Sequence, residues 1–284
     1  MSSPLRMAVI AREQTPRVQD VWRELEPVLR RRKEIQLTAV AVTRDLSPEE
    51  SDVDIALVLG GDGAILRACR VFGDRQAPIL GINLGRLGFL NDLTADEFLE
   101  QLPRIEARDY RVVQHLMYEC LHTRGDSVDR HLGLNEVSIL SGACFQMIDV
   151  ELAIEGRPVT TYSCDGLIIS TPVGSTAHSL SAGGPILQQD LSAFVLTPIC
   201  PHTLSNRPLV DSADLTYTLR VPQAPIGTTI VIDGQIRVPL TPTDSVTVRR
   251  APVSFQLVRL PGHSYYATLQ RKLGWGGQPQ YRKI

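Results

Sequence analysis

The sequence predicts an α/β N-terminal domain with a Rossmann-like parallel sheet, followed by a β-rich C-terminal domain. Strand-like apolar runs at 55–59 and 78–82 bracket a helical pattern at 64–72, which is the order of a parallel βαβ unit. After about residue 110 the pattern changes to short strands and turns, and residues 215–221 alternate apolar and polar side chains. The chain of 284 residues is also long for one hydrophobic core, because cores stop growing at roughly 250 to 300 residues.

The first strand is predicted at 7–11, and a helix follows with six apolar residues at helical spacing between Val18 and Leu29. Pro27 lies inside this pattern. Because proline lacks the backbone donor, we expect it to kink or shorten the helix. A further strand-like run covers 37–42.

A later helix is predicted to begin after Thr94. Thr94 and Glu97 have the spacing of a capping box, and Leu93 and Phe98 have that of a hydrophobic staple. Pro103 is expected to limit this helix. We divide the chain into an α/β domain at 1–110, a β-rich domain at 111–260 and a closing segment at 261–284.

Composition argues against several classes of protein. Hydrophobic residues make up 43% and charged residues 21%, and a formal net charge of −2 gives no basic footprint for nucleic acid. The apolar runs are far shorter than the roughly 20 residues that span a bilayer, and residues 1–6 lack the apolar core of a signal peptide. Five scattered cysteines without a Cys-x-x-Cys pair suit a reduced cytoplasm, and no histidine spacing predicts a protein-bound metal.

The first candidate site is the run Gly60-Gly61-Asp62-Gly63, placed directly between the strand 55–59 and a helix. Glycines here let the backbone approach phosphate oxygens, and the helix presents unpaired N–H groups. A tight turn alone needs fewer glycines, so phosphate contact is the favoured interpretation. Neither the P-loop nor the dinucleotide fingerprint fits. The candidate phosphate-binding residues are Gly60, Gly61, Gly63 and Arg67.

Asp62 is the candidate catalytic residue. A carboxylate beside phosphates is electrostatically unfavourable unless it accepts a proton from an attacking hydroxyl or orders a magnesium ion. The structural alternative is a cap for the first turn of the following helix, and the pattern alone gives both nearly equal weight. A second glycine-rich segment, 83–90, follows the next strand and is expected to lie beside the first loop and form a cleft.

The β-rich half places polar residues among apolar ones, at Asn135-Glu136 and at Asp165. Buried polar side chains are unfavourable without partners, and either a polar ligand or structural hydrogen bonds could supply them. The segment 171–177 gathers hydroxyl and backbone N–H groups that suit a sugar or a phosphate. His178 lies near serines in the sequence, but no strand-elbow motif surrounds them, so a serine hydrolase is not predicted.

Together these segments resemble the NAD kinase family over residues 54–235. The glycine run is shared with a wider superfamily of diacylglycerol, sphingosine and phosphofructo-kinases. The later segments narrow the resemblance because they follow the family order: 83–90, 135–136, 165–176, 181–186 and 198–202.

The resemblance implies an α/β domain plus a β-sandwich-like C-terminal domain, with the end of the chain returning to the first. It also implies a cytoplasmic enzyme that transfers the γ-phosphoryl group of ATP to the 2′-hydroxyl of the adenosine ribose of NAD. Polyphosphate could replace ATP as the donor. Asp62 would act at that hydroxyl as base or positioner, and Asn135 and Glu136 would hold the ribose. Gly61 and Gly63 would approach the phosphates.

The resemblance further implies that Thr176 and Ala177 contact the adenine side. Asp165 would bind NAD across a subunit interface, because family sites are built between protomers, and the assembly would be a homodimer or homotetramer. The residues expected to bind NAD are Asp62, Gly63, Asn135, Glu136, Asp165, Thr176, Ala177, His178 and Ser181.

Two positions depart from the family pattern. Ala64 stands where threonine is usual, which removes a hydroxyl that could touch phosphate. His178 stands where tyrosine is more common, so stacking on a ligand ring is expected to be weaker and pH-dependent. Mg²⁺ or another divalent cation would arrive with ATP, since the sequence offers no dedicated cage for it.

Two other functions compete with this one. The first is a lipid or sugar kinase of the same superfamily, which differs in its acceptor. The second is a catalytically silent regulator that binds a dinucleotide. Intact Asp62, Asn135 and Glu136 argue against the silent regulator.

Overall fold

A computed structural model describes residues 3–11, 15–42, 46–47, 50, 52–85, 88–91, 93–142, 146–203, 206–262 and 264–274. The chain forms two compact units: Met1–Val113 with Gln256–Ile284, and Gln114–Phe255. It passes between them twice, within strands β5 (Arg111–Arg124) and β16 (Ser245–Arg259). None of the helices described has the length and apolar character required to cross a membrane.

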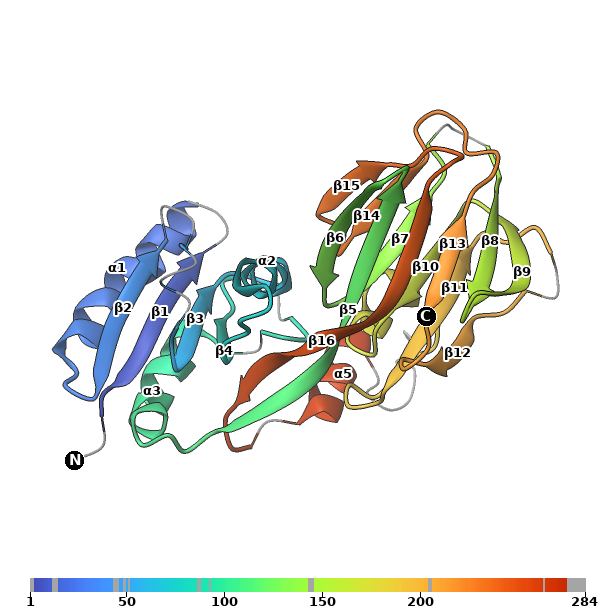
Figure 1. Ribbon diagram of the computed structural model, residues 1–284. Coiled ribbons are helices and arrows are strands. Elements are labelled where there is room, and N and C mark those ends of the chain that lie inside the picture. Colours follow the sequence, from blue (N-terminus) through green and yellow to red (C-terminus); the bar gives the residue numbers. More distant parts are fainter. Residues whose placement is uncertain are drawn as a thin grey trace, which may run out of the picture. The chain divides into compact units, whose positions relative to one another are not determined.

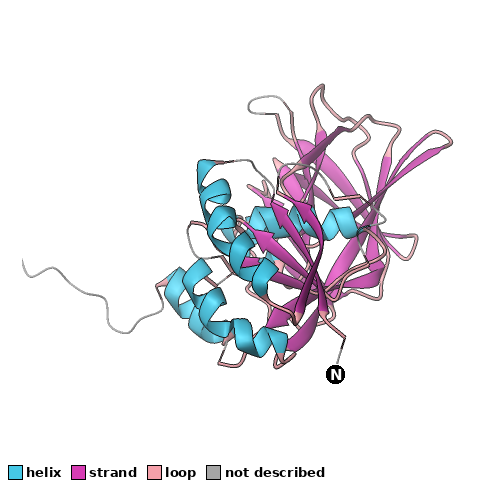
Figure 2. Ribbon diagram, turned by 90° about the vertical axis from the view of Figure 1, so that its left-hand side faces the viewer, coloured by secondary structure: helices cyan, strands magenta, loops and turns pink. Residues whose placement is uncertain are grey.

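The first unit is a parallel sheet flanked by helices (Figures 1 and 2). The strand order is β2-β1-β3-β4, and the last residues of β16 pair with β4 at Leu257 and Ile79. Its elements are β1 Leu5–Ala11, α1 Pro16–Arg31, β2 Ile35–Ala41, β3 Ile55–Leu59, α2 Asp62–Phe72, β4 Ile79–Ile82, α3 Ala95–Glu106 and α5 Tyr265–Leu273.

The apolar pattern explains how these elements pack. All five residues of β3 are buried, as expected for a strand covered on both faces. Helix α1 buries Val18, Leu25 and Leu29, which recur at helical spacing and face the core. Helix α3 begins with the predicted capping box at Thr94 and Glu97.

Neither Pro27 nor Pro103 ends its helix at once. Helix α1 continues past Pro27 to Arg31, and α3 continues past Pro103 to Glu106. Proline removes one backbone donor near the end of each helix, but the apolar stripe on either side of it packs into the core. Burial of Leu29 and Ile105 therefore holds the last turns in place.

The direction in which the chain adds strands across the sheet reverses between β1 and β3. The chain leaves β1 for β2 on one side and returns to β3 on the other. The carboxyl ends of these strands are level, since Ala11 pairs with Leu59 and Leu59 pairs with Ile82. Ligands of open α/β sheets bind at such a reversal, outside the carboxyl ends.

The second unit packs two antiparallel sheets against each other (Figure 1). One contains β16, β13, β8 and β9 with β5 and β6, and the other has the order β12-β11-β10-β7-β14-β15. The remaining elements are β6 Ser127–Gly133, β7 Glu136–Leu140, β8 Ile148–Ile154, β9 Arg157–Cys164, β10 Gly166–Ser170, a short 3-10 helix Gly174–Thr176, α4 His178–Ser181, β11 Ala193–Ile199, β12 Leu209–Ser212, β13 Tyr217–Arg220, β14 Thr229–Ile232 and β15 Ile236–Pro239.

Side chains from both sheets form the core of this unit. Phe194 on β11 and Tyr217 on β13 meet edge to face, with ring centroids 5.8 Å apart. Tyr217, Leu219 and Val221 are buried, which agrees with the alternation predicted at 215–221. The predicted fold class, a parallel α/β domain plus a β-sandwich-like domain, is confirmed.

Candidate active site

The start of α1 and the turns after β3 and β4 line a cavity of about 280 Å³ in the first unit, called here the glycine-turn cavity. Gly60, Gly61 and Gly63 line it, as does the start of the second glycine-rich segment at 83–85. Arg67 is not among the residues that line it.

Two helices begin at the glycine-turn cavity. Helix α1 has Thr15 as its N-cap, and α2 has Gly61. The positive ends of two helix dipoles therefore meet at this cavity, which suits the negative charge of a polyphosphate. Arg17 also lines the cavity and adds a cation, although sequence patterns gave no reason to select it.

Gly60 needs the freedom of glycine. Its φ of 145° is rarely adopted by other residues, and an added Cβ would lie 2.7 Å from the Cβ of Ala64. Ala64 lines the cavity, so the hydroxyl lost by the departure from the family pattern is lost there.

Asp62 is not a helix cap. It is the first residue of α2, and Gly61 before it provides no side-chain cap. Instead, its Oδ2 accepts a hydrogen bond from Phe89 N at 2.8 Å, and its Oδ1 accepts from Leu90 N and Asn91 N, both at 3.2 Å. The prediction that the second glycine-rich segment lies beside the first loop is confirmed, and Arg86 and Leu87 lie outside the described residues.

Asn91 was not predicted from the sequence. It is fully buried, its Nδ2 donates to the carbonyl of Gly60, and its Oδ1 has no hydrogen-bond partner among the described residues. Asn91 thus ties both loops together. The available signal was Gly81, in the interior of β4, where an added Cβ would lie 2.8 Å from Cγ of Asn91.

In the second unit, the structure brings Asn135 and Glu136 together with the turn after β10. The carbonyl of Asn135 accepts from Thr171 N at 2.9 Å, and an added Cβ on Gly174 would lie 2.0 Å from that oxygen. Ser170 pairs with Glu136 across the sheet. The segments that were predicted separately therefore form one polar cluster.

Asp233 holds the backbone at Asn135-Glu136 in place, and it was not predicted from the sequence either. Its buried carboxylate accepts hydrogen bonds from the backbone N–H groups of Leu134, Asn135 and Glu136, at 2.8 to 3.2 Å. The hydroxyl of Tyr118 donates to Asp233 at 3.0 Å. This negative charge lies close to the carboxyl group of Glu136 and acts on it.

Glu136 is 5% exposed, and its Oε2 has no hydrogen-bond partner in the described part of the chain. Burial, with a further contribution from Asp233, raises the pKa of Glu136 to about 8, while the backbone N–H of His178 acts in the opposite direction. Around neutral pH the carboxyl group is therefore mostly protonated and can donate a hydrogen bond to a ligand oxygen.

The turn after β10 uses most of its hydroxyl groups internally. Ser175 donates to the carbonyl of Pro172 at 2.6 Å, and Thr176 donates to that of Val173 at 3.0 Å. Partial desolvation lowers the pKa of His178, which favours a neutral ring. Ser181, at the end of α4, is exposed.

Asp165 is the one predicted residue that its own unit keeps apart from this cluster. It precedes β10, whereas the polar turn follows β10, and Gly166 pairs with Leu140 at the far end of β7 from Glu136. The five residues of β10 separate the two positions by about 17 Å, at roughly 3.3 Å per residue. Asp165 is about half exposed, and its Oδ1 lies 4.0 Å from His202 Nε2.

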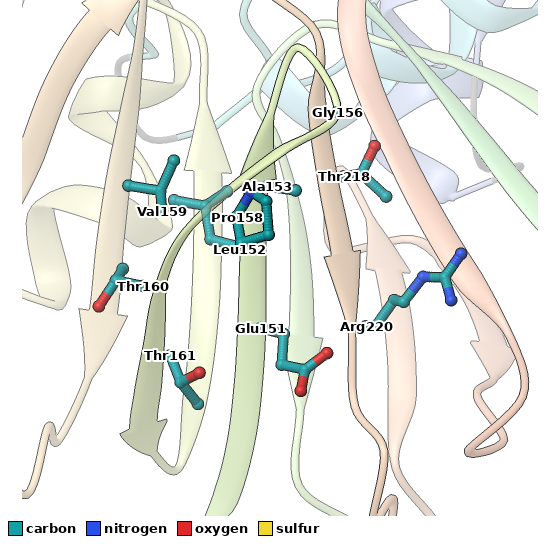
Figure 3. Close-up of a pocket in the computed structure, with 10 residues that line it drawn as sticks. All are labelled: Glu151, Leu152, Ala153, Gly156, Pro158, Val159, Thr160, Thr161, Thr218 and Arg220. Atoms are coloured by element: carbon teal, nitrogen blue, oxygen red, sulfur yellow. The ribbon is translucent and has the colours of Figure 1, made fainter.

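A wider cavity of about 670 Å³ lies on β8, β9 and β13 of the second unit (Figure 3). Figure 3 shows Glu151, Thr160 and Arg220 around it. None of the predicted site residues lines this cavity. Those of the second unit lie on or beside strands of the other sheet, and the rest follow β3 in the first unit. Its volume alone therefore gives no reason to place the chemistry there.

Metal-ligating side chains do not gather in the described residues: no three of His, Cys, Asp or Glu lie close enough to hold an ion. The donors at the glycine-turn cavity are instead backbone N–H groups and Arg17, which bind anions. A parallel sheet with a glycine turn, two helix N-termini and a fixed carboxylate at its carboxyl edge defines a nucleotide-binding phosphotransferase.

The family follows from comparison with known proteins. Residues 7–110 match the model of the ATP-NAD kinase N-terminal domain, and residues 134–260 match that of the ATP-NAD kinase C-terminal domain. The chain belongs to the ATP-NAD kinase family.

Individual relatives agree with this assignment. An NAD kinase of Rhodopirellula baltica is 45% identical over 282 residues, which cover 99% of this chain and 90% of that protein. The crystal structure of an NAD kinase from Archaeoglobus fulgidus in complex with ATP is 28% identical, with a TM-score of 0.76 over 96% of this chain and 100% of that one. The yeast NADH kinase complexed with NADH, at 22% identity and a TM-score of 0.88 over 100% of this chain and 91% of that one, supports the fold.

The chain is thus an ATP-dependent kinase that acts on NAD, as the resemblance in its sequence implied. These matches favour NAD as the acceptor over the lipid or sugar of the competing hypothesis, and an enzyme over a silent regulator.

Proposed function

We propose that Asp62 receives the proton of the 2′-hydroxyl of the adenosine ribose of NAD while that oxygen attacks the γ-phosphorus of ATP. The new oxygen–phosphorus bond forms as the bond to the bridging β–γ oxygen breaks, which yields NADP and ADP. The observation that carries this role is the geometry of the carboxylate. A carboxylate has about four acceptor positions, and the N–H groups of residues 89–91 use three. One position is left for an acceptor hydroxyl.

The glycine-turn cavity binds the phosphates of the donor in this proposal. Two helix N-termini, Arg17 and the N–H groups of Gly61 and Gly63 provide positive potential there. Phosphoryl transfer mainly requires alignment and neutralisation of charge, because the transition state spreads charge over the phosphate oxygens. Mg²⁺ carried by ATP would supply further neutralisation.

The polar cluster of the second unit binds the adenosine portion of NAD. Protonated Glu136 donates to a ribose oxygen, which gives its otherwise unpartnered Oε2 a hydrogen bond. Asn135 holds the same ribose, and the backbone around Thr176 and Ala177 contacts the adenine. The internal use of the Thr176 hydroxyl supports binding through the backbone rather than through the side chain.

Asp165 acts on NAD bound to a second copy of the chain. Support comes from the length of β10, which separates Asp165 from the polar cluster of its own unit. An exposed carboxylate beside His202 is available for contact with another protomer. The proposed assembly is accordingly a homodimer or a homotetramer.

The test is NADP formation by wild type and Asp62→Asn, with ATP or polyphosphate as donor and Mg²⁺ present. Asparagine places an amide N–H₂ against one of the backbone donors, so we expect the free energy of unfolding to fall by about 1 to 3 kcal/mol. Turnover of the folded variant is expected to fall by about 10² to 10⁴, while NAD still raises the melting temperature.

Asp96→Asn is the matched control, because Asp96 lies in the first turn of α3 and is exposed. This control variant should change neither the free energy of unfolding nor the turnover. Near-wild-type turnover in Asp62→Asn would remove Asp62 from the reaction. Absence of NADP with both donors would overturn the proposed reaction itself.

A further inference from the structure

Phe89 links Asp62 to the end of strand β16. Its backbone N–H donates to Oδ2 of Asp62 at 2.8 Å, and its carbonyl accepts from Nη2 of Arg259 at 3.3 Å. Arg259 is the last residue of β16 and is only 7% exposed. A buried guanidinium is conformationally restricted, so it fixes the carbonyl that it contacts.

The side chain of Phe89 is held by a second cation. Nζ of Lys272 lies 4.3 Å from the centre of the Phe89 ring, a distance typical of a cation–π contact. Lys272 lies in the last turn of α5, which begins with a cap in which the Ser264 hydroxyl accepts from Ala267 N at 3.4 Å. Leu269 of the same helix is 2% exposed and anchors it.

We propose that Arg259 and Lys272 are positioning residues for phosphoryl transfer: they fix Phe89, and Phe89 fixes the Asp62 carboxylate that meets the acceptor hydroxyl. The proposal rests on the proposed role of Asp62. Neither cation is placed at the substrate. They act because a displacement of about 1 Å in a reacting group can lower turnover about 10²-fold.

Phe89 connects the turn that holds Asp62 with the two cations. The turn at 89–91 supplies all three N–H donors that Asp62 receives. Asn91 fixes the far end of this turn through the carbonyl of Gly60, and the two cations fix the near end. Loss of either cation removes one of these two contacts of Phe89 and so loosens the donor to Oδ2 of Asp62.

The first experiment measures kcat and KM for four variants. Lys272→Met keeps most of the side-chain volume but removes the charge, and about a fivefold loss of kcat is expected from one exposed cation–π contact. Lys272→Arg should recover most of that loss. Arg259→Met should lower kcat about 10²-fold, since it also removes a buried donor. The control is Arg271→Met, an exposed neighbour of Lys272, which should leave kcat unchanged.

Positioning predicts a split between the kinetic constants. KM for NAD and ATP should stay within about twofold of wild type, because the Asp62 carboxylate contributes at most one hydrogen bond to ground-state binding and its alignment matters chiefly in the transition state. The loss of kcat is measured at a temperature where all variants are folded, with the NAD-induced rise in melting temperature as the check on binding. Lys272 is exposed, so Lys272→Met provides the test if Arg259→Met fails to fold.

A double-mutant cycle with Asp62→Asn separates this proposal from the proposed function. If the cations act through Asp62, Lys272→Met should lower kcat by less than about twofold in the Asp62→Asn background. The same fivefold loss in both backgrounds would overturn the positioning role while leaving the role of Asp62 intact. Near-wild-type kcat in Asp62→Asn alone would overturn the role of Asp62, and the positioning role with it.

Discussion

A methyl group on Gly88 would lie 1.9 Å from Oδ1 of Asp62, well inside van der Waals contact. The neighbour it would strike is the carboxylate that the turn at 89–91 holds by three hydrogen bonds. Gly88 is therefore a position where the backbone must pass close to the carboxylate proposed to receive the proton.

We expect Gly88→Ala to displace the Asp62 carboxylate and to lower turnover about 10²-fold. The control is Gly125→Ala in the turn between β5 and β6, where φ is 56° and an added Cβ has open space. That variant should lose about 1 to 2 kcal/mol of stability from the left-handed conformation, with unchanged turnover of the folded protein. Unchanged turnover in Gly88→Ala would show that the carboxylate tolerates movement.

The second prediction concerns pH and Glu136. Burial and then Asp233 raise its pKa from 4.5 to about 8 in the folded state. The folded state therefore holds this proton more tightly than the unfolded state between these values, so stability decreases as pH rises from about 4.5 to about 8. Glu136→Gln cannot ionise and should lack this contribution.

Urea unfolding of both proteins at pH 5, 6.5 and 8 measures the effect. The difference in the free energy of unfolding should shift in favour of Glu136→Gln as pH rises, by at most about 1.4 kcal/mol per pH unit. Parallel stability curves would show that the carboxyl group ionises equally in the folded and unfolded states.

The third prediction tests the proposal that Asp165 completes the NAD site of a second protomer. Asp62→Asn and Asp165→Ala should each be nearly inactive alone. When the two are unfolded together and refolded, mixed assemblies contain one site with both wild-type residues. For a homodimer, about half of the assemblies are mixed and each mixed one has one intact site of two, so roughly a quarter of wild-type activity should return. Recovery would be absent if Asp165 served the NAD site of its own protomer.

The fourth prediction concerns the stability of the second unit. Burial alone would raise the pKa of Asp244, but hydrogen bonds from Arg124, His122 and Thr241 hold it well below the ordinary range. Its contribution to stability is therefore present above about pH 4 and is lost as pH falls further. Asp244→Asn should cost about 1 to 3 kcal/mol at pH 7, since it leaves a buried donor unpaired. Asp129→Asn, at an exposed position, is the control for urea unfolding.

Local patterns placed the glycine turn correctly because they depend on neighbours in the chain. A buried run at 55–59 followed by Gly60 and a helix requires a turn at the carboxyl edge of a parallel strand. The capping box at Thr94 is local in the same way. Such features involve residues within one turn of each other, and the tertiary fold only confirms them.

Contacts between distant segments could not be predicted in this way. Asp233 lies 97 to 99 positions along the chain from the residues whose N–H groups donate to it, and Arg259 lies 170 positions from Phe89. No local spacing marks either residue. The interpretation of Asp62 as a cap was wrong for the same reason, since the donors that satisfy it come from another loop. Both helices continue for a few residues past Pro27 and Pro103, because apolar side chains beyond each proline are buried.

The order in which the ribosome makes this chain has a consequence for the first unit. Its residues up to Val113 emerge early, but the strand end that pairs with β4 and the helix that carries Lys272 belong to Gln256 onward. The early segment therefore waits with an open sheet edge while the whole second unit is synthesised. The contacts of Phe89 with Arg259 and Lys272 form only after that, so the setting proposed for Asp62 is completed by residues made after the second unit.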